Sequence, residues 1–249
     1  MQASGSKQLH SKAPIVTVDV VLLTLKDEQL CAALLQRPRE PHAGEWTLPG
    51  GFVHTDEDED TLAAAARILS TKVGIESPYL EQLQTFSGPH RDPRGWSVAI
   101  VYYALVPHDS VPGEAPAPRA EHAPATVLSI AAPPRLKWRP VDDIRSLPFD
   151  HLQILRTAVE RVRSKTLYSS LPVHLMSATF TLSELQAVYE ALLGTRLDKR
   201  GFRRRIEELD VVEEAPGAPV RGAHRPAQRY RMKRHGAQRL AVSPKNLTL

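Results

Sequence analysis

Hydrophobic and polar residues follow a strand-like pattern through much of the first half of the chain. Residues 14–25 and 30–37 are rich in β-branched and aliphatic side chains and flank the polar, turn-like sequence KDEQ, so they predict a β-hairpin. Residues 79–86 and 96–106 predict two more strands, joined by the turn-forming sequence SGPHRDPRG. The short run LKWRPV predicts a further strand, and together these segments predict a sheet.

Helical spacing of apolar residues appears twice in the same part of the chain. It predicts one helix over residues 60–73, with Gly74 as its C-terminal stop, and another over residues 150–165. Segments 41–51 and 107–135 are expected to be irregular, because Pro and Gly cluster in the first and seven prolines interrupt the second. Strands combined with two helices predict an α/β/α sandwich, in the α/β or α+β class.

A second region of helical spacing follows this predicted sandwich. Residues 180–193 predict a helix that begins with the capping-box pair Thr181 and Glu184 and ends at Gly194. Residues 199–209 predict another helix with an apolar face. Two helices separated by a short turn are typical of a helix-turn-helix.

Two short segments after these helices have the pattern of a β-ribbon. Residues 211–214 and 228–232 can pair around a tip that is rich in Gly and Pro. Helix, turn, helix and ribbon is the element order of a winged helix-turn-helix. We therefore expect an N-terminal α/β/α domain over residues 1–165, a linker over residues 166–179 and a winged helix-turn-helix domain over residues 180–249.

Charge is unevenly distributed between the two expected domains. The chain has a net charge of +4, but residues 195–249 contain 14 Lys and Arg against 6 Asp and Glu, whereas residues 1–194 contain 18 against 22. A basic module joined to an acidic one indicates contact with a polyanion. The single cysteine excludes a disulfide framework and a cysteine-based zinc site. No apolar run approaches the length of about 20 residues that a membrane span needs, and no signal peptide is visible, so a cytoplasmic protein is expected.

Basic side chains concentrate on the second helix of the expected helix-turn-helix and on its wing. Arginine on a helix in the major groove can read guanine, and arginine on a wing can reach the phosphate backbone of double-stranded DNA. The alternative is a solvated basic helix face, which leaves the basic wing and tail unexplained. The candidate DNA-binding residues are Lys199, Arg200, Arg203, Arg204, Arg205, Arg221, His224, Arg225 and Arg229.

Residues 49–75 resemble the Nudix box, G-x5-E-x7-R-E-U-x-E-E-x-G-U, in which U is aliphatic. Four residues occupy their expected positions: Arg67, Leu69, Gly74 and Ile75. The three glutamates of the second half of the box are replaced by Ile68, Thr71 and Lys72. Mg²⁺ needs oxygen ligands, which these side chains do not provide in place of glutamate. The sequence therefore predicts a retained scaffold without a metal site or hydrolytic activity.

Acidic residues before the box helix leave an alternative open. Glu59 can be aligned with the first box glutamate only if the loop is two residues longer than the pattern, and it could equally be a surface carboxylate. The run DEDED at residues 56–60 could have some metal affinity, but it lies at the other end of the helix from the missing glutamates. We favour a solvated acidic loop, and we assign no metal role to His42 or His54.

Several residues around the box have the chemistry of a phosphate or nucleotide site. A glycine loop that leads into a helix lets backbone approach a diphosphate, and arginine pairs bidentately with phosphate. Trp96 could stack on a base or pack in the core. The candidate effector-binding residues are Arg37, Gly50, Gly51, Phe52, Arg67, Arg91, Arg94 and Trp96.

Across nearly its whole length the chain resembles the Nudix-related transcriptional regulators of the NrtR family. The resemblance rests on the following segments: VDVVLLTL, GEWTLPGGFV, YLEQLQTFSGPHRDPRGWSV, FDHLQILRTAVERV, FTLSELQAVYEALLG and GFRRRIEEL. It implies a homodimeric repressor of NAD biosynthesis or salvage genes that binds a palindromic operator and senses ADP-ribose or a related metabolite, with no required cofactor. Two alternatives remain: an active nucleoside-diphosphate (ADP-ribose) pyrophosphatase with a basic accessory domain, and a related regulator of sugar catabolism.

Overall fold

The computed structural model describes four stretches of the chain: residues 13–76, 79–111, 135–216 and 227–233. Strands β1 (Ile15–Lys26) and β2 (Gln29–Gln36) form the predicted antiparallel hairpin. Asp27 and Glu28 connect them with backbone φ angles of 49° and 60°. Two successive residues with positive φ match the right-handed twist of the strands, so this tight turn fixes the register of the hairpin.

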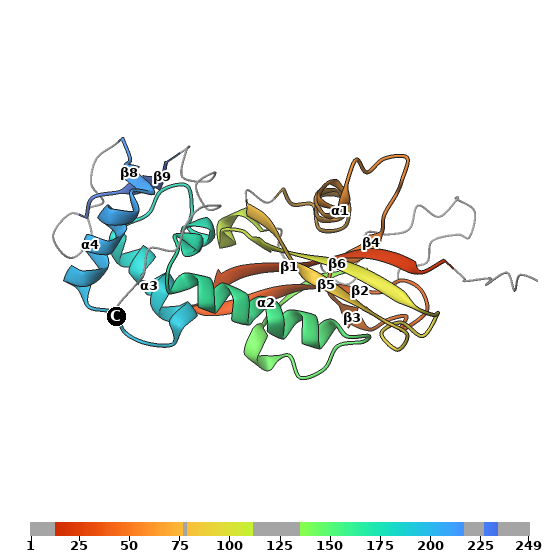
Figure 1. The fold of residues 1–249 in the computed structure, drawn as a ribbon. Coiled ribbons are helices and arrows are strands. Elements are labelled where there is room, and N and C mark those ends of the chain that lie inside the picture. The colour runs from red at the N-terminus through yellow and green to blue at the C-terminus, as the bar shows by residue number, and fades with distance from the viewer. Residues whose placement is uncertain (1–12, 77–78, 112–134, 217–226, 234–249) are drawn as a thin grey trace, which may run out of the picture.

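Strand β1 is the centre of a mixed seven-stranded sheet (Figure 1). It pairs in parallel with β6 (Ser97–Leu105), which is antiparallel to β5 (Tyr79–Gly88). On the other side β2 pairs with β7 (Leu136–Pro140), as well as with β1. All five strands were expected from the alternation and apolar runs of the sequence, and those predictions are confirmed.

The segment 41–51, which was expected to be irregular, contributes two short strands. Strand β3 (Trp46–Thr47) pairs with the end of β2, and β4 (Gly50–Phe52) pairs with Thr17–Asp19 of β1. Pairing of only two or three residues leaves no periodic signal, which explains why the sequence pattern does not predict it. The β4 pairing fixes the glycine loop against the middle of the sheet.

One helix covers each face of the sheet (Figure 1). Val20 and Leu22 of β1 pack with α1 (Thr61–Ile68), whereas Val21 and Leu23 pack with α2 (His151–Thr166). Side chains of a strand alternate between the two faces, so a strand buried on both sides reads as a continuous apolar run. The predicted α/β/α sandwich is therefore confirmed.

The box helix is not a single regular helix. Asp60 caps its start by accepting a hydrogen bond of 2.8 Å from the backbone of Ala63. After α1 the chain continues as a π-helical turn, η1 (Leu69–Val73), which ends at Gly74 with φ of 74°. The predicted span and stop are confirmed. The π turn was not predicted, and it contains Thr71 and Lys72, two of the three residues that replace the box glutamates.

The segment 166–179, expected to be a linker, is instead packed between the two domains. It contains the 3₁₀ helix η4 (Leu171–Leu175), in which all five residues are buried. Leu171 and Leu175 join the core of the sheet and α2, while Val173 joins the core of the C-terminal domain. Alternating apolar residues over such a short stretch do not reveal two different packing partners. The two domains therefore share apolar contacts through this segment.

The C-terminal domain has the predicted order of elements. Helix α3 (Leu182–Leu193) begins with the complete capping box, and α4 (Lys199–Leu209) follows after a short turn. Strands β8 (Val212–Glu214) and β9 (Tyr230–Met232) form the antiparallel ribbon of a winged helix. Among the described residues, no helix is long and apolar enough to cross a membrane. The N-terminal domain also contains two short 3₁₀ turns, η2 (His108–Ser110) after β6 and η3 (Val141–Asp143) after β7.

Candidate functional site

The glycine loop lies against a buried carboxylate of the central strand. Gly50 pairs with Asp19, and a Cβ atom on Gly50 would lie 2.0 Å from Asp19 Oδ1. No side chain fits there without moving that carboxylate. Gly51 faces the box helix, because its Cβ would lie 3.7 Å from Ile68 Cδ1. Gly50 is therefore required for close approach of the loop, whereas a side chain at Gly51 would press only on the flexible end of Lys72.

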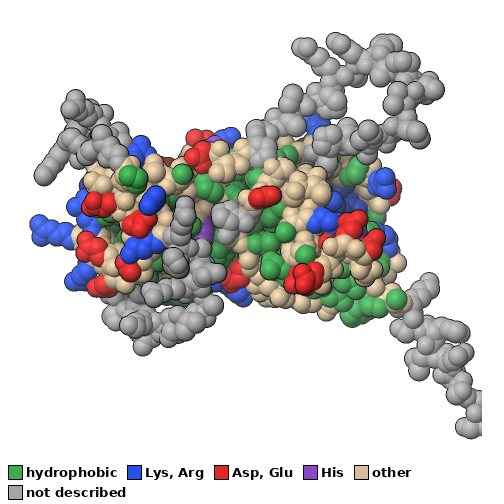
Figure 2. Space-filling view, turned by 90° about the horizontal axis from the view of Figure 1, so that it is seen from above, with side chains coloured by type: hydrophobic (Ala, Val, Ile, Leu, Met, Phe, Trp, Pro, Cys, Tyr) green, Lys and Arg blue, Asp and Glu red, His purple; other side chains and the backbone are tan. Residues whose placement is uncertain are grey.

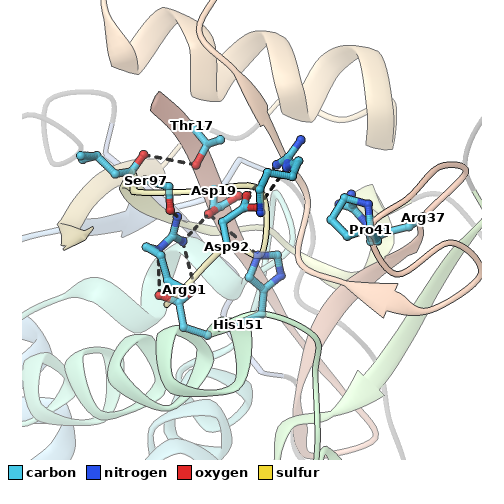
Figure 3. Close-up of polar contacts among 11 residues, drawn as sticks. Thr17, Asp19, Arg37, Pro41, Arg91, Asp92, Ser97 and His151 are labelled. Carbon is cyan, nitrogen blue, oxygen red and sulfur yellow. Dashed lines mark hydrogen bonds and ion pairs between the residues drawn. The ribbon is translucent and has the colours of Figure 1, made fainter. Parts of the chain in front are cut away.

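A buried polar cluster lies beside this loop (Figure 3). Arg91 donates hydrogen bonds of 3.0 and 2.9 Å to the two oxygens of Asp150, and its guanidinium is 3.6 Å from Asp19 Oδ2. It also donates to the hydroxyl of Ser97 at 3.2 Å. Only 9% of the Arg91 side chain is exposed. Arg91, predicted to bind an effector, is thus bound to carboxylates of its own chain, which it connects across the site.

His151 joins the same cluster from the first residue of α2. Its Nδ1 accepts a hydrogen bond of 3.1 Å from the backbone of Leu48, and its Nε2 is 3.9 Å from Asp19 Oδ2. Burial lowers the pKa of His151 below its usual value, and the nearby Asp19 opposes that shift. Burial raises the pKa of Asp19, which His151 and Arg91 partly offset. The base of the site is therefore a desolvated, internally paired set of charges.

Arg94 and Phe52 form an exposed part of the site, and Trp96 is a further exposed aromatic side chain two residues after Arg94. Arg94 makes a bidentate pair with Asp92 at 3.0 and 2.7 Å, and its guanidinium carbon lies 5.3 Å from the centre of the Phe52 ring. Phe52 and Trp96 are 50% and 48% exposed. The structure therefore does not place Trp96 in the core, and its indole is accessible for stacking. A planar guanidinium over an exposed ring offers both a cation and an aromatic surface to a nucleotide.

Arg67 connects the long acidic loop to strand β4, which follows Pro49. It pairs with both oxygens of Asp58 at 2.7 Å and donates a hydrogen bond of 3.0 Å to the carbonyl of Phe52. The side-chain hydrogen bonds from Arg67 lower the pKa of Asp58 to about 2. Asp58 and Asp60 are thus used for this pair and for helix capping. This arrangement supports a structural acidic loop over a metal site, and effector binding by Arg67 remains a prediction.

Arg37 also has partners within the chain. Its Nε donates a hydrogen bond of 2.7 Å to the carbonyl of Pro41, and its guanidinium carbon is 4.9 Å from the centre of the Phe149 ring. Burial lowers the pKa of Arg37. No carboxylate of the described residues makes an ion pair with it, so Arg37 remains a candidate for phosphate or ribose.

The residues in place of the box glutamates do not fit a divalent cation. Ile68 is fully buried and apolar, and the Thr71 hydroxyl donates a hydrogen bond of 2.7 Å to the carbonyl of Arg67 within the helix. The Lys72 ammonium donates to the carbonyl of Gly50. The described stretches contain no group of three or more His, Cys, Asp or Glu side chains that could hold a metal ion. Oxygen ligands in octahedral geometry are what Mg²⁺ requires, and this site does not supply them.

Four residues of the site were not predicted from the sequence. Asp19 had a signal, because it is the only charged residue in the apolar run 14–25. Asp150 and His151 had none, since the turn before α2 is an ordinary polar segment. Lys72 was interpreted only as a lost ligand. The sequence therefore predicts the glycine loop and its aromatic and arginine neighbours, but not the buried carboxylates that hold the arginines.

Helix α4 displays four basic side chains to solvent. Lys199, Arg200, Arg203 and Arg204 are exposed, and within the described stretches only Arg204 of these four makes an ion pair, with Glu208 at 3.8 Å. Figure 2 shows Lys and Arg side chains extending from the end of the molecule that carries this helix. Exposed and weakly paired arginines are free to meet an external polyanion.

Arg205 differs from the prediction for the rest of α4. It is half-buried and donates a hydrogen bond to the carbonyl of Leu167, which follows α2. Burial lowers the pKa of Arg205. Since α4 has about 3.6 residues per turn, the residue after Arg203 and Arg204 points toward the protein. Arg205 therefore connects α4 to the residue that follows α2, in contrast to the exposed Arg203 and Arg204.

The predicted wing residues are only partly described. Arg229 donates two hydrogen bonds of 3.1 Å to the carbonyl and the hydroxyl of Thr179, so it anchors the base of the wing. Arg221, His224 and Arg225 lie outside the described residues. The DNA-binding prediction for these three positions remains a prediction.

Comparison with known proteins agrees with this two-domain arrangement. The model of the NUDIX domain matches residues 13–160, and the model of the NrtR DNA-binding winged helix domain matches residues 172–232. An ADPR responsive transcriptional repressor of Acinetobacter baylyi is 41% identical over 219 residues, which is 88% of this chain and 82% of that protein. The ADP-ribose pyrophosphatase of Methanocaldococcus jannaschii is 34% identical over 89 residues, 36% of this chain and 49% of that enzyme.

A solved structure extends the similarity to three dimensions. The crystal structure of Shewanella oneidensis NrtR complexed with a 27mer DNA has a TM-score of 0.76 and 38% sequence identity, covering 90% of this chain and 95% of that one. Both domains and their order are included in that coverage. The chain therefore belongs to the NrtR family, with a NUDIX domain followed by an NrtR-type winged helix domain.

Proposed function

We propose that this protein is a transcriptional repressor that releases its operator when it binds ADP-ribose. The observation that carries the proposal is a Nudix site without its box glutamates in the same chain as a helix with four exposed basic residues. The name of the similar Acinetobacter baylyi repressor supports ADP-ribose as the effector. The similar protein from Shewanella oneidensis, crystallised with DNA, supports operator binding by the winged helix.

The nucleotide would bind over the glycine loop. Gly50 and Gly51 allow a diphosphate to approach the backbone, and Arg37 is the nearby arginine without a carboxylate partner. Phe52 with Arg94, or the exposed Trp96, offers a surface for stacking of adenine. Hydrolysis is not expected, because activation of water by a bound metal needs the oxygen ligands that the box lacks.

Helix α2 connects this site to the DNA-binding helix. It begins with Asp150 and His151, which hold Arg91 and Asp19 at the site, and it has 16 residues, or a length of about 24 Å. Just beyond its other end, the carbonyl of Leu167 accepts the hydrogen bond from Arg205 of α4. A ligand that shifts the start of α2 would therefore shift α4. This route links effector binding to the position of the arginines.

A homodimer would present two copies of α4 to a palindromic operator. Half-sites of such an operator lie about one turn of DNA, or a multiple of it, apart, so a small change in the spacing of the two helices weakens binding. For a release of DNA, ADP-ribose must bind the DNA-incompetent arrangement more tightly. A 100-fold preference supplies about 2.7 kcal/mol of bias per site.

The test uses a duplex that the purified protein selects from a random pool. NAD, ADP-ribose, AMP and nicotinamide mononucleotide are then titrated into the protein–DNA complex in a gel shift. The proposal expects ADP-ribose or a close relative to release the duplex. Retention of the complex with every one of these nucleotides would contradict it. A search of the genome with the selected sequence separates regulation of NAD biosynthesis or salvage from regulation of sugar catabolism.

Hydrolysis of ADP-ribose is the second candidate function. It is favoured by the 34% identity to the Methanocaldococcus jannaschii ADP-ribose pyrophosphatase. Release of AMP from ADP-ribose with Mg²⁺, at a rate above about 1 s⁻¹, would establish it. We expect no AMP, because the three box positions hold an apolar group, a hydroxyl bonded to its own helix and an ammonium.

A further inference from the structure

The Lys72 side chain lies where the box pattern has a metal-binding glutamate. It extends from η1, and its ammonium donates a hydrogen bond to the carbonyl of Gly50. The ammonium would be 3.1 Å from a Cβ atom on Gly51. Lys72 is thus directed into the glycine loop, at the point where a diphosphate would approach the backbone.

Charges around this ammonium leave it without a carboxylate of its own. Asp19 attracts it, but the Asp19 carboxylate already faces Arg91 and His151, and no Asp or Glu of the described residues makes an ion pair with Lys72. Arg67 and Arg37 add like charge near it. A partly buried cation without an anion is unfavourable, so this position is stabilised by an anionic ligand.

We propose that the Lys72 ammonium takes the place of the divalent cation and binds the diphosphate of ADP-ribose directly. An ammonium has three N–H donors, of which one is used by Gly50 and two can point to phosphate oxygens. It neutralises one negative charge but has no coordination position for a water molecule. The same substitution therefore retains binding and removes hydrolysis. This inference rests on ADP-ribose being the effector.

The experiment measures ADP-ribose affinity by titration calorimetry in excess EDTA and in Mg²⁺. Wild-type protein is expected to bind equally, within a factor of two, under both conditions. Lys72→Met keeps the length of the side chain without its charge and is expected to bind at least 10-fold more weakly, again without dependence on Mg²⁺. Lys72→Glu is expected to bind most weakly in EDTA, because it places a carboxylate against the diphosphate.

Lys26→Met is the matched control, because Lys26 lies at the far end of β1 from Gly50. It should bind ADP-ribose like the wild type. DNA binding without ADP-ribose reports that each variant is folded, since α4 is remote from Lys72. If the wild type binds ADP-ribose 10-fold or more weakly in EDTA than in Mg²⁺, the proposed role of Lys72 is overturned. It is also overturned if Lys72→Met binds ADP-ribose as tightly as the wild type does. Neither result contradicts ADP-ribose as the effector. Failure of the wild type to bind ADP-ribose in either buffer overturns the proposed effector as well.

Discussion

The arginines of the N-terminal domain and those of α4 differ in what they contact. Arg67, Arg91 and Arg94 each make a bidentate pair with an aspartate of the same chain. Arg203 makes no ion pair among the described residues, and Arg204 has only a distant one, with 79% of its side chain exposed. The same residue type therefore builds a site in one domain and faces solvent in the other. What distinguishes the two sets of arginines is whether a carboxylate of the same chain pairs with them, and not how many arginines each domain contains.

The largest effect is expected from Arg203→Ala with Arg204→Ala. Loss of two contacts to bases or phosphates should weaken operator binding by about 2 to 6 kcal/mol and reduce the slope of log affinity against log salt by up to about 2. Both side chains are exposed, so the free energy of unfolding should change by less than about 1 kcal/mol. Fluorescence anisotropy across a salt series measures the first effect and urea unfolding the second.

The matched control for this double variant is Arg145→Ala with Arg156→Ala. Both residues are exposed and lie outside the C-terminal domain, and the pair removes the same net charge. If the control weakens DNA binding as much as the α4 variant, then net charge rather than α4 determines affinity, and the distinction between the two sets of arginines is lost.

Removal of Arg91 should lower the stability of the protein, unlike removal of Arg203 and Arg204, which should lower its affinity for DNA. Arg91→Met leaves the buried carboxylate of Asp19 and the partly buried carboxylate of Asp150 without this partner, which costs about 3–5 kcal/mol of stability. Chemical unfolding at neutral pH measures this loss. A change below about 1 kcal/mol would show that the buried pairs are not what holds the site.

His174, at the junction of the two domains, gives a pH-dependent comparison. It is buried against the Tyr79 ring at 4.5 Å, and burial lowers the pKa of His174 to about 4. The unfolded chain takes up this proton near pH 6.5, before the folded chain does, so stability falls as the pH drops from about 6.5 to 4. The fall is about 3 kcal/mol by this linkage. His174→Phe keeps an aromatic ring at this position without the titrating group. The free energies of unfolding of this variant and of the wild type should differ by a constant amount above pH 7, and the difference should change below pH 7.

The smallest effect is expected from Arg205→Met. Its hydrogen bond to Leu167 links α4 to the end of α2, whereas its charge does not face DNA. DNA affinity without effector should change by less than 3-fold, but the factor by which ADP-ribose weakens DNA binding should fall by 5-fold or more, or about 1 kcal/mol of coupling. An unchanged response to ADP-ribose would exclude this contact from the transmission route.

Much of the fold could be predicted from the sequence because its signals are local. The β1–β2 hairpin, α1 and α3 each have periodic apolar residues and a turn or cap at the expected end. The packed segment 166–179 could not be predicted, because its alternating apolar residues enter two different cores. Local pattern gives elements, whereas packing partners depend on contacts between distant residues.

The same limit applies to the candidate site. The glycine loop and the basic helix were predicted, because the residues of each lie next to one another in the sequence. The roles of Arg91 and Arg205 depend on Asp150 and Leu167, which are 59 and 38 positions away. The sequence does not distinguish an arginine that can bind an external ligand from one that is paired within the chain. The contacts in the folded structure make that distinction. Asp19 is the exception, since one charge in an apolar strand already indicates a buried functional carboxylate.

The most direct test of release without hydrolysis measures DNA binding and the fate of ADP-ribose in the same sample. ADP-ribose is added in excess EDTA to the protein bound to its selected fluorescent duplex, the anisotropy is recorded, and the nucleotide is then recovered and separated by chromatography. The account predicts that the duplex is released and that the ADP-ribose is recovered intact. A complex that persists at saturating ADP-ribose, or release only when Mg²⁺ is present and AMP is formed, would contradict it.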